Sequence, residues 1–209
     1  MNRVLDRGAI FAGWVGAGMA AVIVLSFELV IPVQPVVFYS APLAGLLIGY
    51  YANARSERAG GAWTRVLTNA LYAGLVTGLS LAILYGAVRL LFFYADAGFS
   101  AEDRGGAVTC RSGADCTYQR YLANPAYAAE LRTAGVADAA GFERYFLGQQ
   151  LNGGLILVLW TAVPALLGGV AYGASNSGAL RPAPNVSASA DEALADEDAI
   201  APLPPATRE

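Results

Sequence analysis

Hydrophobic residues in this chain are gathered into four long runs, at positions 9–31, 36–52, 71–94 and 151–172, and almost no charged residue interrupts them. A helix needs about 20 apolar residues to cross the ~30 Å hydrocarbon core of a bilayer. Three of the runs reach that length, and the second falls slightly short of it. The pattern predicts an all-α, multi-pass membrane protein, a bundle of four transmembrane helices at about 9–31, 36–52, 69–94 and 151–174.

The composition indicates the same class of protein. Hydrophobic residues make up 56% of the chain and charged residues 14%, with a mean hydropathy of +0.47 that soluble domains rarely reach. The net charge is only −3, so we expect the lipid bilayer and not nucleic acid as a partner. All 13 basic residues are arginine and histidine is absent, which removes the usual ligand of haem and zinc. We therefore expect no cofactor.

Arginines distinguish the two sides of the predicted bundle. Short loops that carry arginine stay in the cytoplasm. Such residues precede the first run or lie between the second and third: Arg3, Arg7, Arg55, Arg58 and Arg65. We expect cytoplasmic N and C termini, three spans within 1–94 and an extracytoplasmic loop at 95–150. Frequent alanine, glycine and arginine without lysine is typical of GC-rich bacterial genomes, which predicts a bacterial cytoplasmic membrane.

The predicted extracytoplasmic loop contains the only two cysteines, Cys110 and Cys116. An oxidising compartment favours a disulfide between them, and the small ring would restrain the turn that they enclose. Two free thiols are the alternative. Their spacing is not C-x-x-C, and two thiols alone cannot complete a structural zinc site, so neither redox catalysis nor metal binding is expected.

The second half of the loop is predicted to contain short helices. Asn124 followed by Pro125 is typical of a capped helix start, and Gly135 would end that helix. Asp138 can cap another short helix. Aromatic residues follow it and also end the third span, and we expect them to form a belt at the membrane interface, a docking surface being the alternative: Phe142, Tyr145, Phe146, Phe92, Phe93 and Tyr94.

The C-terminal segment, 175–209, differs in composition from the rest of the chain. It is rich in proline, alanine and acidic residues, and from residue 175 onward it has no aromatic residue. Such a segment cannot bury enough apolar surface to offset its loss of conformational entropy on ordering. We predict a disordered cytoplasmic tail.

Glycines recur at four-residue spacing within the apolar runs. In lipid, helices associate through close backbone contact, which small residues permit. Three G-x-x-x-G pairs have this spacing: Gly45 with Gly49, Gly74 with Gly78, and Gly169 with Gly173. They predict tightly packed helices and leave self-association open.

The first and third spans align when one is shifted by 61 positions, and the second and fourth align through Pro42 and Pro164. This predicts two similar helical hairpins in parallel, with each proline kinking or starting a helix. The shift superimposes Glu28 on Arg89, the two charges embedded in the spans. Both lie near the outer boundary, so an interhelical ion pair, or separate snorkelling of the two side chains to the outer headgroups, is favoured over a functional polar path.

The sequence offers no catalytic set, since the spans contain no histidine, no cysteine and no G-x-S-x-G motif. We do not expect an enzyme. The favoured hypothesis is a non-enzymatic accessory, assembly or scaffold component that packs against membrane partners or copies of itself. The alternative is a small oligomeric transporter or channel with a polar path formed by Glu28, Arg89, Asn69, Thr77, Ser80 and Tyr85.

Overall fold

The computed structural model of the chain describes residues 5–30, 34–56, 62–95 and 110–175. These residues form six α-helices and one π-helical turn, with no strand among them. Four of the helices are long and apolar enough to cross a membrane. The predicted all-α class with four spans is therefore confirmed for the described residues. The predicted disordered tail lies, from residue 176 onward, outside the described residues.

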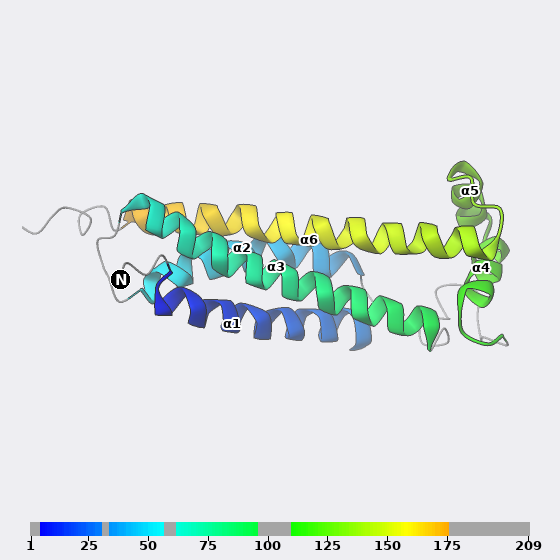
Figure 1. Cartoon of the computed structure of the whole chain (residues 1–209), viewed down its shortest axis with the longest axis horizontal. Coiled ribbons are helices and arrows are strands. Elements are labelled where there is room, and N and C mark those ends of the chain that lie inside the picture. The colour runs from blue at the N-terminus through cyan, green and yellow to red at the C-terminus, as the bar shows by residue number, and fades with distance from the viewer. Residues whose placement is uncertain (1–4, 31–33, 57–61, 96–109, 176–209) are drawn as a thin grey trace, which may run out of the picture.

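The long helices run side by side, and two short ones lie across one end of the bundle (Figure 1). In chain order the elements are α1 (Arg7–Val24), η1 (Leu25–Val30), α2 (Gln34–Ala54), α3 (Trp63–Tyr94), α4 (Ala114–Ala123), α5 (Pro125–Thr133) and α6 (Ala139–Ser175). The helix α1 continues directly into the π-helical turn η1. Helix α1 begins at the end opposite α4 and α5 (Figure 1).

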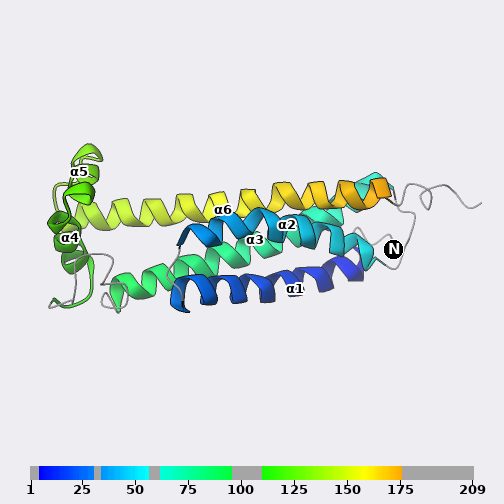
Figure 2. The same ribbon diagram turned by 180° about the vertical axis from the view of Figure 1, so that it is seen from behind.

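The four long helices differ in length. With 32 and 37 residues, α3 and α6 are about 48 and 55 Å long, well beyond the ~30 Å of a hydrocarbon core. The 21 residues of α2 give about 32 Å. Both views show α3 and α6 extending past α1 and α2 at the end where α4 and α5 lie (Figures 1 and 2). We call α4, α5 and residues 139–149 of α6 the head.

The predicted second short helix of the loop does not exist as a separate element. Asp138 does cap a helix, because its carboxylate accepts a hydrogen bond from the Gly141 amide at 2.6 Å, but that helix is α6 itself. The prediction of a short helix after Asp138 and a separate span that begins at residue 151 is wrong, because α6 includes both. The polar residues there lower the hydropathy, but they include no proline, and the backbone hydrogen bonds of a helix continue past polar side chains.

The bundle has a rhombic cross-section. Helices α2 and α3 pack against each other, and each also packs against both α1 and α6. Among the described helices, α1 and α6 lie at opposite corners without an extensive contact. The hairpin α1–α2 and the hairpin α3–α6 therefore lie side by side. If a two-fold axis related the two hairpins, α1 would contact α6 as extensively as α2 contacts α3. Among the described helices, α1 and α6 have no such contact.

The burial of α1 and α3 matches the 61-residue shift. Seven residues of α1 are buried, from Gly8 to Val24, and each residue 61 positions later, from Asn69 to Tyr85, is buried in α3. The proline-based alignment of α2 and α6 agrees less well, because Ala41 is buried and the aligned Val163 is exposed. The duplication therefore stays a prediction that one helix pair supports.

The two prolines lie inside helices. Pro42 is in the interior of α2 and Pro164 in the interior of α6. Neither begins a helix, contrary to one of the two predicted roles. Pro in a helix removes one backbone hydrogen bond, and packing against neighbouring helices compensates for that loss in a membrane bundle.

Candidate functional site: polar groups at the two ends of the bundle

The predicted glycine pairs lie where helices contact most closely. A Cβ added to Gly45 or Gly49 of α2 would overlap the backbone carbonyl of Thr161 or Ala165 in α6. A Cβ at Gly78 would lie 2.9 Å from the Cα of Val158. The remaining pair members also face neighbouring helices: Gly74 faces Ala165, Gly169 faces Ala70, and Gly173 faces Trp63. These surfaces are occupied by the chain's own helices.

The hydroxyl groups in the middle of the bundle bind their own helices. Thr77 donates to the Ala73 carbonyl at 2.8 Å, and Ser80 donates to the Val76 carbonyl at 2.8 Å. Both bonds reach four residues back along α3, a common way for a membrane helix to satisfy a hydroxyl. Both hydroxyl groups therefore donate within α3 and not to a neighbouring helix.

Glu28 lies in the π-helical turn that ends the first span. Its side chain is only 5% exposed, and its neighbours in the turn, Phe27 and Leu29, pack against the apolar core that includes Tyr85 and Val88. A π-helical turn inserts one extra residue into a helix, and such turns are frequent at functional sites. The structure thus places a buried carboxyl group at the level where the bundle meets the head.

Arg89 of α3 lies at a similar level. Its guanidinium carbon is 5.9 Å from the centre of the Phe146 ring in α6, within the range of a cation–π contact. One turn further along α6, the Oε1 atom of Gln150 is buried without a hydrogen-bond partner among the described residues. Gln150 was not among the predicted site residues, although this residue directly precedes the apolar run that begins at Leu151. The predicted Glu28–Arg89 ion pair stays a prediction.

The predicted aromatic belt is wrong for the residues at its centre. Phe93, Phe142 and Phe146 are 2%, 0% and 6% exposed and form, with Leu131 of α5, the core of the head. The Phe93 and Phe146 rings stack with centroids 4.3 Å apart. The spacing of Phe142 and Phe146 does place both on one face of a helix, but α4 and α5 cover that face. These three rings therefore serve neither as interfacial anchors nor as a docking surface.

Hydrogen bonds tie the helices of the head together. Tyr94, the last residue of α3, bonds to the Glu143 carboxylate of α6. Tyr145 of α6 donates to the Glu130 carboxylate of α5 at 2.5 Å, and Gln149 lies within hydrogen-bonding distance of the same phenol. The predicted cap is also present, since Asn124 accepts from the Ala126 amide at 3.0 Å. These bonds thus join the head to α3 and join α5 to the α6 part of the head.

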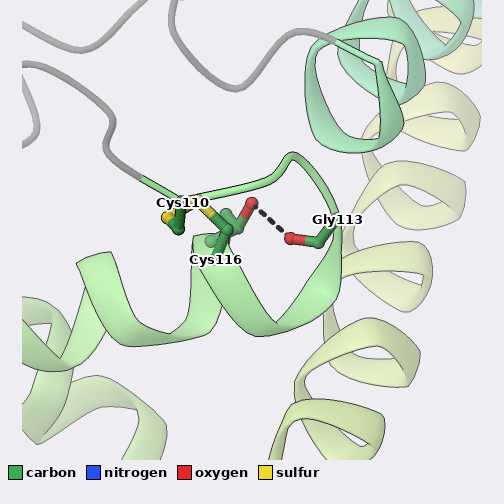
Figure 3. Close-up of a disulfide and its surroundings, with 4 residues drawn as sticks. Cys110, Gly113 and Cys116 are labelled. Carbon is green, nitrogen blue, oxygen red and sulfur yellow. Dashed lines mark hydrogen bonds between the residues drawn. A yellow bond between two sulfur atoms is a disulfide. The ribbon is translucent and has the colours of Figure 1, made fainter.

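The two cysteines form a disulfide at the start of α4 (Figure 3). Between them, Gly113 has a φ of +138°, which disfavours any side chain at that position. Its carbonyl accepts a hydrogen bond from the Thr117 hydroxyl at 3.0 Å, drawn as a dashed line in Figure 3. The disulfide joins residue 110 to the first turn of a helix that the sequence analysis had not predicted.

A buried polar cluster lies at the opposite end of the bundle; we call it the basal cluster. The Asp6 carboxylate accepts hydrogen bonds from Ser56 at 2.5 Å and from the Asn69 amide at 3.2 Å. Asn53 donates to the Val66 carbonyl at 3.1 Å. Asp6 and Asn69 are 9% and 1% exposed. The sequence analysis named only Asn69, because nothing local in the sequence indicates which partners meet Asp6.

No known protein family matches the chain, and neither the curated proteins nor the solved structures contain a significant match. Within the described residues, no group of three or more carboxylate, thiol or imidazole side chains is arranged to hold a metal ion. The inference of function therefore rests on the geometry of this chain.

Proposed function

We propose that this protein is a non-enzymatic accessory, assembly or scaffold component of a membrane, which presents its head to partners outside the bilayer. The single observation that carries the proposal is the continuity of α6, which runs as one 37-residue helix from the head into the bundle. A head mounted on such a helix cannot reorient independently of the spans. The hydrogen bonds of Tyr94 and Tyr145 further restrain it.

The packing of the bundle also favours this function over transport within one chain. Along the short diagonal of the rhombus, α2 and α3 are in direct contact, and glycines bring both helices onto the backbone of α6. Solute coupling usually relies on broken helices or charges at the midplane. In the described spans the middle is occupied by alanines, glycines and hydroxyls bonded to their own helices.

Site-specific photo-crosslinking in native membranes tests the proposal. A photoreactive residue at Leu122, exposed on α4, should give a discrete protein adduct. The matched control is Ile83, which is exposed on the apolar surface of α3 and should crosslink mainly to lipid. Absence of a protein adduct from Leu122 and from further exposed head positions would contradict the proposal.

A transporter or channel is the second candidate, and one observation favours it: the buried carboxyl group of Glu28 in a π-helical turn. Reconstitution into proteoliposomes tests this function. Solute or ion flux that Glu28→Gln abolishes, while the protein stays folded, would favour transport. Flux that equals that of empty liposomes would favour the scaffold function.

We further propose that the membrane is a bacterial cytoplasmic membrane and that both termini are cytoplasmic, with the head on the opposite side. The orientation is supported by the arginines at or beside the helix ends opposite the head, which are Arg7, Arg55 and Arg65. The bacterial membrane is supported by the composition, which is rich in alanine, glycine and arginine and lacks lysine. Because both native cysteines form a disulfide, single added thiols can report sidedness. In intact cells, an impermeant maleimide should label Leu122→Cys but not Ser175→Cys. The reverse pattern would invert the orientation.

A further inference from the structure

We propose that the end of the bundle opposite the head binds a phosphate group, in a recess between Arg7 and Arg55, and that membrane phospholipid supplies it. The recess has a volume of about 320 Å³ and is lined by Arg7, Gly8, Phe11 and Arg55. Both arginine side chains are exposed. The lining contains two cations and no carboxylate.

The basal cluster brings the two arginines together. Asp6 immediately precedes Arg7, and Ser56 immediately follows Arg55. The 2.5 Å hydrogen bond from Ser56 to Asp6 therefore holds the two arginine-bearing segments side by side. Gly8 permits the same approach, because a Cβ there would overlap the Arg55 carbonyl. These contacts set the backbone positions of the two arginines, so a ligand would meet both side chains on one side of the bundle end.

Among the described residues, the carboxylate next to these arginines in the sequence is that of Asp6, and it does not line the recess. Asp6 is 9% exposed, and its Oδ2 accepts from both Ser56 and Asn69, on the interior side of the bundle. In the described part of the chain, neither Arg7 nor Arg55 forms an ion pair or a side-chain hydrogen bond. The Arg55 guanidinium carbon lies 5.7 Å from the centre of the Phe11 ring.

These features correspond to the chemistry of a phospholipid headgroup. Guanidinium groups bind phosphate through paired, charge-assisted hydrogen bonds. Phe11 is 50% exposed one turn further into the first span, where it can contact the beginning of an acyl chain. Arg7 begins α1, so the recess lies at the boundary of the predicted span, the depth at which lipid phosphates occur. The inference holds whether or not the head binds partners.

Thermal unfolding of the full-length protein in neutral detergent tests the site. Dioleoylphosphatidylglycerol should raise the melting temperature in a saturable manner, whereas dioleoylglycerol, which has the same chains without phosphate, should not. Replacing both arginines, by Arg7→Gln with Arg55→Gln, should increase the half-saturating lipid concentration roughly tenfold or more. Circular dichroism and gel filtration verify that this variant is folded.

The matched control is Arg65→Gln, which removes the same charge at the same end of the bundle but outside the recess. It should leave the lipid response unchanged. An equal loss of response in Arg65→Gln would overturn the proposal, because it would indicate general attraction of anions. A response to dioleoylglycerol equal to that of the phosphatidylglycerol would also overturn it.

A third titration distinguishes the source of the phosphate. If sodium phosphate produces no shift while phosphatidylglycerol does, the ligand is the lipid. If sodium phosphate produces the same arginine-dependent shift, the recess is a phosphate site that free phosphate can fill. No shift with either compound would overturn the proposal. Native mass spectrometry gives an independent measure, since the arginine variant should retain fewer phosphatidylglycerol molecules than Arg65→Gln.

Discussion

Gly49 of α2 lies directly against the backbone carbonyl of Ala165 in α6, so that a Cβ at position 49 would overlap that oxygen. We expect Gly49→Ala to separate the two helices and destabilise the bundle by about 1–3 kcal/mol. The measurement is unfolding by heat or by sodium dodecyl sulfate in mixed micelles. Gly18→Ala is the control, since a Cβ at Gly18 meets nothing within 4 Å. Equal stability of the two variants would contradict the packing at Gly49.

Asp6 and Asn69 should be energetically coupled through their hydrogen bond in the basal cluster. Asp6→Ala removes the acceptor of the Asn69 amide, and Asn69→Ala removes one of the two donors to the Asp6 carboxylate. The double variant should therefore lose less stability than the sum of the single variants. We expect a coupling of about 0.5–3 kcal/mol in a double-mutant cycle. Strict additivity of the two effects would show that the bond contributes nothing.

Removal of the disulfide should loosen α4 and leave the spans folded. Replacing Cys110 and Cys116 with serine opens a small covalent loop. The added conformational entropy of the unfolded chain should lower the free energy of unfolding of this region by about 2 kcal/mol. Hydrogen exchange should increase at 114–123 and remain unchanged in the middle of α3. The native protein should react with a thiol reagent only after reduction. Labelling without reduction would contradict the disulfide.

The core of the head should depend on Phe142, which is fully buried. Phe142→Ala removes a ring that contacts Phe93, Tyr118 and Tyr121, and we expect it to cost about 3–5 kcal/mol of local stability. Limited proteolysis should then cleave α4 and α5 faster. Leu151→Ala on the same helix is the control, because Leu151 is 77% exposed.

The proposed ion pair between Glu28 and Arg89 predicts a specific order of stabilities. Glu28→Gln alone should destabilise the protein more than Glu28→Gln together with Arg89→Gln, because the single change leaves the arginine without its counter-charge. Melting temperatures in detergent at neutral pH measure the order. Equal melting temperatures for the two variants would exclude the pair.

Several local features could be predicted because they depend on neighbouring residues. The cap at Asn124 and the cap at Asp138 both follow from side chains placed directly before a helix. Other features could not be predicted because they require partners distant in the sequence. The basal cluster joins Asp6 to Asn69, 63 positions away, and α4 and α5 cover aromatic rings that a helical projection leaves exposed. The full length of α6 was not predicted, because hydropathy distinguishes apolar from polar residues but does not indicate where a helix ends.

The sequence by itself determined the class of protein, since long uncharged apolar runs satisfy their backbone hydrogen bonds in a bilayer only as helices or closed barrels, and the length of these runs selects helices. Only the tertiary structure decided which surfaces those helices use. Packing brought the glycines of α2 onto the carbonyls of α6 and enclosed Phe142 in the head. It also placed Arg7 beside Arg55, because the hydrogen bond between Asp6 and Ser56 joins segments 50 residues apart. Such contacts form between residues that are close in space but distant in the sequence, so the residue pattern of a single helix does not reveal them.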